Sequence, residues 1–304
     1  MSEKRFQIVC DSCCDLPKED VESLGIDIVP LYVSFDGVNY KRDFFDFSYH
    51  DFYQEMLDNP GSYPKTSLPS VEDYINIWEL YIKEGVPVLS VSMTSSMSGS
   101  YNSALNAREV IRDRYPEAQI EVIDSQALTL FEGMLIKEAA RLRDAGLELS
   151  DAAERFKEMR RLGRAYFTIG DLSYLMKGGR IGGLVKLAAV SLGIKPVILF
   201  SEGNISLCTI TRSRHKSLRE LARQAAQFFV NNKEDPSNYY LEVGYGLLKE
   251  NGEELMALFG GFLKEAGLKA DLKLSQIGTM VGAHNGPDLM GIALQKRSVI
   301  EAGI

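Results

Sequence analysis

Two hydroxyl-rich segments carry residue types suited to binding a small anion. The first has the sequence TSLPS at positions 66–70, and the second has the sequence TSSMSGS at positions 94–100. Each follows an apolar run and precedes an amphipathic pattern of helical period, so we expect their hydroxyls to gather at two helix N-termini. Such ends favour carboxylates and phosphates, because unsatisfied N–H groups and the helix dipole both point at the ligand. The segments therefore indicate a pocket for an anionic head group.

Two other interpretations of these hydroxyls stay open. Serine and threonine are common caps and turn residues, although two such clusters, one with Gly99 for close backbone approach, favour an anion site. A nucleophilic serine is the second alternative, with Ser98 assisted by His284 and by Asp11 or Asp15. The sequence contains no G-x-S-x-G elbow in support of that alternative.

Two later segments also hold groups that could face an anion. The stretch LMKGGRIGG at 175–183 places four glycines within six residues beside Lys177 and Arg180. It could cradle a phosphate or form a flexible, solvated turn, and its spacing matches no nucleotide fingerprint. In GAHNGP at 282–287, His284 lies in an expected loop, where an imidazole could donate to an anion or serve only in a turn.

Composition and charge restrict the class of protein. The chain has 304 residues, enough for about two domains, with 45% hydrophobic and 25% charged residues. Its net charge of -8 argues against a nucleic-acid partner, which normally requires a basic face. The most membrane-like stretch, 182–200, is interrupted by charges and proline, so we expect a helix followed by a strand there. The first residues lack the apolar core of a signal peptide.

The cysteines and histidines predict neither a disulfide scaffold nor a metal centre. The four cysteines are too few and too clustered for a disulfide framework, and we expect them to be reduced in a cytoplasm. A C-x-x-C pair at positions 10 and 13 leaves a metal or redox site as the less favoured alternative. Three dispersed histidines form no metal-binding pattern. We therefore expect no metal and no cofactor.

The first half of the chain is expected to position these groups around a parallel sheet. Strands are predicted at 6–10, 26–35, 87–93 and 119–123, and helices at 48–57, 70–84, 101–114 and 127–145. Alternating strands and helices favour a parallel sheet covered on both faces, whose ligands collect beyond the carboxyl ends of the strands. Three polar turns fall at such ends, at 11–15, 94–100 and 124–125.

The second half mixes hairpin strands with helices. Strands are predicted at 165–169, 195–200, 205–211, 239–245 and 272–277, and helices at 150–162, 216–231 and 253–266. The segment 201–204 (SEGN) is a hairpin turn pattern. The fold class is therefore α/β with two domains, an N-terminal mainly parallel α/β/α sandwich at 1–160 and a C-terminal mixed α+β domain at 161–304.

Six short motifs, taken in order, resemble the DegV family of bacterial fatty-acid-binding proteins. They are DSxxDL at 11–16, TSxPS at 66–70, SxMSGSYNSA at 95–104, LxYLxKGGRI at 172–181, KP at 195–196 and HxGP at 284–287. The resemblance covers essentially the whole chain and implies one long-chain fatty acid buried between the two domains. Cys13, Cys14, Ser100 and Asp288 depart from the residues that are usual at their positions in the family.

The resemblance also implies roles for the matching residues. Positions that bind the fatty-acid carboxylate are matched by Thr66, Ser98, Ser95 and His284. Positions in the loops that support the head group are matched by Asp11, Ser12 and Gly99. Positions that face a partner protein resemble Arg180 and Arg212, and Arg180 is expected on an exposed loop.

The family resemblance implies a lipid-binding substrate carrier rather than an enzyme. Such a protein presents its bound carboxylate to a separate ATP-dependent fatty acid kinase subunit. It then receives the acyl phosphate and carries it toward phospholipid synthesis, which leaves room for transient contact with a membrane or an acyltransferase. A serine-dependent hydrolase or phosphotransferase, and a non-catalytic lipid sensor, are the alternative functions.

Overall fold

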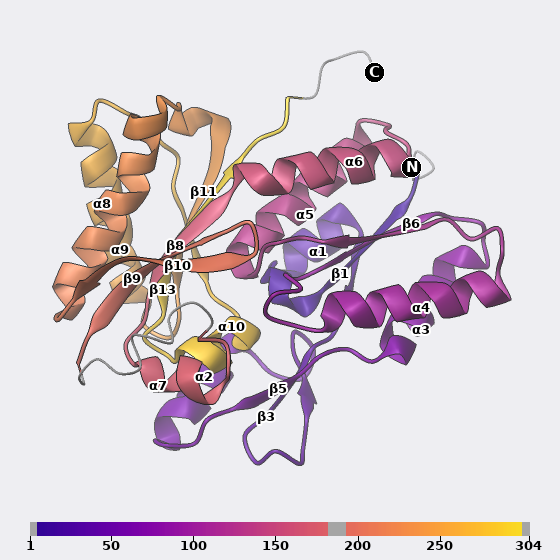
Figure 1. The fold of residues 1–304 in the computed structure, drawn as a ribbon, viewed down its shortest axis with the longest axis horizontal. Coiled ribbons are helices and arrows are strands. Elements are labelled where there is room, and N and C mark those ends of the chain that lie inside the picture. The colour runs from indigo at the N-terminus through magenta and orange to yellow at the C-terminus, as the bar shows by residue number, and fades with distance from the viewer. Residues whose placement is uncertain (1–4, 182–192, 300–304) are drawn as a thin grey trace.

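The first half of the protein forms the predicted parallel sheet. The computed structural model describes residues 5–181 and 193–299 (Figure 1). The strand order is β2-β1-β6-β7, and every neighbouring pair is parallel. The strands are β1 (Gln7–Asp11), β2 (Ile26–Val29), β6 (Val88–Ser92) and β7 (Ile120–Asp124). The three polar turns do lie at the carboxyl ends of β1, β6 and β7, as the sequence predicts.

Helices cover both faces of this sheet. They are α1 (Lys18–Leu24), α3 (Val71–Ile82), α4 (Ser100–Arg114), α5 (Thr129–Asp144) and α6 (Leu149–Met159). The remaining helix of the first half, α2 (Tyr49–Asp58), packs instead in a separate cluster with Leu31 and Val33. Trp78 of α3 and Ala107 of α4 pack with Val9 on one face, while Phe131 of α5 packs with Ile8 and Cys10 on the other. This division follows from the strand period, because successive side chains of β1 point to opposite faces.

The segment around Thr66 differs from its prediction. Thr66 lies on a short strand, β5 (Lys65–Ser67), which pairs with β3 (Tyr32–Ser34), and β3 also pairs with β4 (Lys41–Arg42). The expected strand at 26–35 is divided into β2 and β3 around Pro30. Helix α3 begins only at Val71, with Ser70 and Asp73 forming a capping box. Thr66 is therefore not at a helix N-terminus.

The second half is built on a mixed sheet of order β10-β9-β8-β13-β11-β12. Its strands are β8 (Arg164–Thr168), β9 (Lys195–Ser201), β10 (Asn204–Thr211), β11 (Tyr239–Tyr245), β12 (Lys273–Gln276) and β13 (Met290–Lys296). The predicted hairpin joins β9 to β10, and β11 and β12 are the parallel pair. Strand β13 was missing from the sequence prediction. Helices α8 (Arg214–Asn232) and α9 (Lys249–Glu265) pack against this sheet through a second core.

A shared core joins the two halves, and two short helices lie beside it. Helix α5 contacts β1 as well as β11 and β13, so its apolar side chains belong to both halves. Helices α7 (Leu172–Lys177) and α10 (Thr279–Asn285) contact each other, and α10 also contacts α2 (Figure 1). Short 3-10 turns are η1 (Ser12–Cys14), η2 (Arg160–Leu162) and η4 (Pro236–Asn238).

Some expectations extend beyond what the structure describes. The expected helix after Ile181 and two of the four clustered glycines lie outside the described residues. The domain boundary at residue 160 stays a prediction. Among the helices that the structure describes, none combines the length and apolar character needed to cross a membrane.

Candidate ligand-binding site

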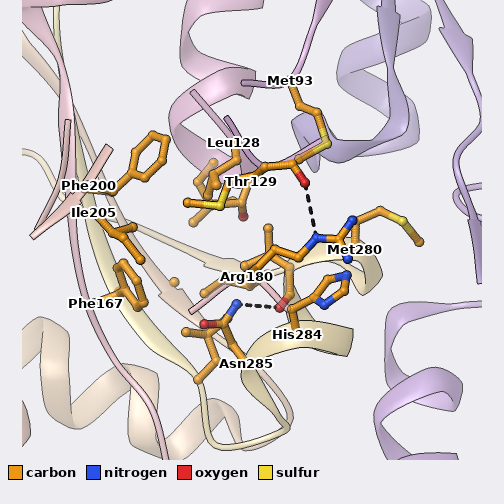
Figure 2. Close-up of a pocket in the computed structure, with 18 of the residues that line it drawn as sticks. Met93, Leu128, Thr129, Phe167, Arg180, Phe200, Ile205, Met280, His284 and Asn285 are labelled. Carbon is orange, nitrogen blue, oxygen red and sulfur yellow. Dashed lines mark hydrogen bonds between the residues drawn. The ribbon is translucent and has the colours of Figure 1, made fainter. Parts of the chain in front are cut away.

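A cavity of about 240 Å³ lies between the mixed sheet of the second half and the segments that follow the strands of the parallel sheet, and it is lined by residues from both halves. Its apolar lining includes Met93, Leu128, Phe167, Phe200 and Ile205. Its polar lining includes Thr66, Ser98, Arg180, His284 and Asn285. Figure 2 shows Arg180 and His284 on one side of the cavity and Phe167, Phe200 and Ile205 on the other. The cavity thus has a polar region and an apolar region, which suits an amphiphilic ligand.

Thr66 and His284 meet at the polar side of the cavity. The Thr66 Oγ1 atom lies 2.8 Å from the Nε2 atom of His284, although 218 positions separate the two residues in the chain. His284 lies in the last turn of α10, not in a loop as the sequence suggested. The helix was missed because it is only seven residues long and contains Gly282. Strand β5 and helix α10 together bring the hydroxyl and the imidazole into contact.

The surroundings of His284 keep its imidazole neutral. Burial, and to a smaller extent the positive charge of Arg180, lower the pKa of His284 to about 4. A Cβ atom on Gly178 would lie 2.1 Å from the His284 Nδ1 atom, so the ring lies directly against that glycine. At neutral pH the imidazole can therefore donate one hydrogen bond into the polar side of the cavity without carrying a charge.

Arg180 lines the cavity instead of standing on an exposed loop. Its Nε atom donates to the carbonyl oxygen of Met97 at 3.2 Å, and its Nη1 atom donates to the carbonyl oxygen of Gly178 at 2.7 Å. The turn that follows α7 points the side chain back toward the segment before α4, which explains its partial burial. Arg212, by contrast, is exposed after the end of β10. Arg180 brings a positive charge to the cavity, and Arg212 does not.

The serine-rich turn before α4 contributes one cavity residue. Ser98 lines the cavity, and its Oγ atom lies 2.8 Å from the Ser100 Oγ atom and accepts the Ser100 N–H at 3.2 Å. Gly99 is the N-cap of α4, so this segment does stand at a helix N-terminus. Ser95 is exposed instead, and its hydroxyl donates to Asp124 Oδ2 at 2.5 Å. The structure therefore places Ser98 at the cavity and Ser95 outside its lining.

Asp11 and Ser12 do not line the cavity, but they form hydrogen bonds to the backbone of residues that do. The Asp11 carboxyl accepts the backbone N–H groups of Met93, at 2.8 Å, and Cys13, at 3.2 Å. The Ser12 hydroxyl accepts the N–H of Leu31 at 3.0 Å. Met93 and Leu31 both line the cavity, so these bonds hold its wall in place. Burial raises the pKa of Asp11 to about 7.

The arrangement does not match a serine-histidine-aspartate relay. The Nε2 atom of His284 faces Thr66 rather than Ser98, and no hydrogen-bond partner for its Nδ1 atom exists among the residues that the structure describes. Asp15 bonds to Thr129 and to the N–H of Gly278. A triad requires the histidine to bond both to the nucleophile and to the carboxylate.

The cysteines form no metal centre in the described part of the chain, where no cluster of three or more potential ligands is present. Cys10, Cys13 and Cys14 are buried free thiols, and the sulfur atoms of Cys10 and Cys14 are 3.8 Å apart.

The apolar wall was not predicted from the sequence. Phe167 comes from β8, Phe200 from β9 and Ile205 from β10. Each lies in an apolar run that was correctly predicted as a strand, but the run alone does not show which face borders a cavity. Ala165, Tyr166 and Phe167 of β8 all line the cavity, so a simple alternation of lining residues would not have indicated it.

Comparison with known proteins identifies close relatives of the whole chain. The family model described as "Uncharacterised protein, DegV family" matches residues 5–297. A DegV domain-containing protein of Listeria monocytogenes is 30% identical, covering 96% of this chain and 98% of its own. The structure of a stearic acid-binding protein from Eubacterium ventriosum is similar with a TM-score of 0.89 and 38% identity, covering 96% of this chain and 98% of that one. A fatty-acid-binding DegV family protein from Thermus thermophilus has a TM-score of 0.82 and 27% identity, covering 96% and 99%.

Proposed function

The chain belongs to the DegV family, and we propose that it binds one long-chain fatty acid in the cavity lined by both halves of the chain. The observation that carries this proposal is the division of the cavity into an apolar side and a side with Arg180, His284 and Thr66. The similarity to the stearic acid-binding protein of Eubacterium ventriosum, at 38% identity over nearly the full length, supports the same ligand class.

The physical chemistry of the cavity fits this ligand. Each methylene buried against Phe167, Phe200 and Ile205 contributes about 0.8 kcal/mol, so a long tail supplies most of the binding free energy. A carboxylate buried without partners would cost several kcal/mol. The guanidinium of Arg180 offsets its charge, and the hydroxyls of Thr66 and Ser98 can donate hydrogen bonds to it.

We further propose that the bound carboxylate is presented to a separate ATP-dependent fatty acid kinase subunit in the cytoplasm. The protein would then carry the acyl phosphate toward phospholipid synthesis. The exposure of Arg212 supports a role for this residue in contacting such a partner. Arg180 lies at the polar side of the cavity, where it would meet the carboxylate itself.

Mass spectrometry of lipid extracted from the denatured protein tests the ligand class. We expect one C14–C18 fatty acid per chain, and stearic acid should bind the delipidated protein. Acyl phosphate formation in the presence of ATP and the kinase subunit tests the carrier function. An empty protein that also fails to bind stearic acid would contradict the first proposal. Hydrolysis of acyl esters by the protein alone would favour the hydrolase alternative, and binding without acyl phosphate formation would favour the lipid sensor.

A further inference from the structure

Helix α10 carries His284 on one side and two glycines on another. Gly278, the N-cap residue, and Gly282 are four positions apart and therefore share one face of the helix, which we call the glycine face. His284 lies on nearly the opposite side, where it lines the cavity beside Met280. The position of the imidazole therefore depends on what holds the glycine face.

Two side chains from the first half of the chain hold that face. The N–H of Gly278 donates to Asp15 Oδ2 at 2.7 Å, and the Tyr53 hydroxyl donates to the carbonyl oxygen of Ile277 at 3.0 Å. A Cβ atom on Gly278 would lie 2.0 Å from Asp15 Oδ1, and one on Gly282 would lie 2.4 Å from the Tyr53 hydroxyl. Glycine is thus the residue that lets α10 approach these groups so closely.

Asp15 joins three segments that are distant in the sequence. It follows η1, its Oδ2 atom accepts the hydroxyl of Thr129 at the start of α5, and the same atom accepts the N–H of Gly278. Asp15 and Thr129 both have positive φ angles, of 49° and 51°. For a β-branched residue such as Thr129 this backbone conformation is strained, and the surrounding contacts must hold it in place. The contacts among Asp15, Thr129 and Gly278 therefore offset the conformational free energy that these backbone angles cost.

We propose that Asp15 is a positioning residue that clamps the glycine face of α10 and thereby holds His284 against Thr66 in the ligand cavity. Asp15 does not line the cavity and so acts on the ligand through its partners, which are helix α10 and the cavity-lining residue Thr129. If the carboxyl is removed, the buried N–H of Gly278 loses its acceptor and α10 loses its attachment to η1 and α5. The ligand part of this inference rests on the proposed function, whereas the position of His284 does not.

The chemistry of the junction suggests a conservative variant. Burial raises the pKa of Asp15 to about 8, with smaller contributions from the neighbouring carboxyls of Asp43 and Asp11. Asp15 is therefore mostly protonated at neutral pH, and an asparagine amide reproduces the acceptor oxygen that Gly278 and Thr129 need. Asp15→Asn should keep the clamp, and Asp15→Ala should release it. Glu132→Gln is the matched control, because Glu132 is a fully buried carboxyl on α5 that lies outside the cavity lining.

The pKa of the His284 imidazole can be measured by NMR in the ligand-free protein, so this test requires no ligand. The His284→Gln variant assigns the resonance. In the wild type, Asp15→Asn and Glu132→Gln, we expect the pKa of His284 to stay near 4. In Asp15→Ala it should rise toward the ordinary value, because the ring becomes solvated. The dissociation constant for stearic acid should rise about tenfold in Asp15→Ala and stay unchanged in the other two variants.

Gly278→Ala tests the same contact from the other side and decides the question if Asp15→Ala fails to fold. Its added methyl group should push α10 away from Asp15 and raise the pKa of His284 in the same way. An unchanged His284 pKa in the folded Asp15→Ala or Gly278→Ala protein would overturn the proposal. A His284 pKa that rises in Asp15→Asn would overturn it as well. Normal His284 behaviour combined with no stearic acid binding in the wild type would instead contradict the proposed function alone.

Discussion

Thr66 and Ser98 reach the cavity from different local structures, a strand and the turn before a helix. The double variant Thr66→Ala/Ser98→Ala removes both hydroxyls from the head-group side. Each hydrogen bond lost to a carboxylate costs about 1.5–3 kcal/mol, so the loss of two should raise the dissociation constant for stearic acid at least about a hundredfold. Isothermal titration calorimetry measures the change, with Ser23→Ala, an exposed hydroxyl on α1, as the control. Unchanged affinity in the double variant would remove both residues from the site.

Variants of Arg180 and Arg212 should distinguish fatty acid binding from presentation of the carboxylate to the kinase subunit. Arg180→Ala removes the positive charge from the cavity and should weaken stearic acid binding by about tenfold or more. Arg212→Ala should bind normally, because its exposed side chain does not line the cavity. If Arg212 contacts the kinase subunit, its loss should reduce acyl phosphate formation, since arginines at interfaces often contribute about 2 kcal/mol or more. Equal turnover by Arg212→Ala and the wild type would exclude that contact.

At the scale of elements, the end of α7 and the end of α10 must fit together at Gly178. This glycine has a φ of -73°, which alanine adopts without strain. A Cβ atom there would meet the His284 ring most closely, at 2.1 Å from Nδ1, and the Tyr174 carbonyl oxygen at 3.0 Å. Gly178→Ala should displace the imidazole from Thr66 and weaken stearic acid binding about tenfold while the melting temperature changes little. Gly261→Ala is the matched control, because a Cβ atom there meets nothing within 4 Å. Normal affinity in Gly178→Ala would mean that the ring has no part in holding the head group.

At the scale of the whole molecule, buried carboxyls collect where the first sheet meets α5 and α10. Burial raises the pKa of Asp43 to about 6, of Asp11 to about 7 and of Asp15 to about 8, from an ordinary value of 3.8. The folded protein therefore binds more protons than the unfolded chain between these values. The stability that these groups contribute is complete below pH 3.8 and is lost as the pH rises through 6 to 8.

The free energy of unfolding should accordingly fall when the pH is raised from about 6 to about 8.5. The free energy of unfolding should fall by about 1.4 kcal/mol per pH unit for each carboxyl that is still protonated in the folded state but ionised in the unfolded chain. The fall should level off above the folded-state pKa of that carboxyl. Urea unfolding at the two pH values measures this difference. Asp15→Asn, which cannot ionise, should flatten the upper part of the profile. Stability that stays constant or rises over this range would show that these carboxyls are already ionised in the folded protein.

The sequence by itself determined the elements that depend on local interactions. The hairpin turn at 201–204 was predicted because its partners lie within a few residues. The alternation of strands and helices predicted the parallel sheet. The chain direction in such a sheet predicted that the polar turns lie together at the carboxyl ends of its strands. Thr66, Ser98 and His284 were selected through a family resemblance that fixed residue identity and order, and all three line one cavity.

Only the tertiary structure decided which of the selected residues meet. The contact between Thr66 and His284 spans 218 positions, and the contact between Asp15 and Gly278 spans 263. No local pattern specifies such pairs, because they depend on how two sheets and α10 pack around α5. The same packing turned Arg180 into the cavity, while the turn after β6 directed Ser95 to Asp124. Propensity and periodicity reflect interactions between residues that are close in the sequence. A binding site is formed by residues that are distant in the sequence and are held together by a shared core.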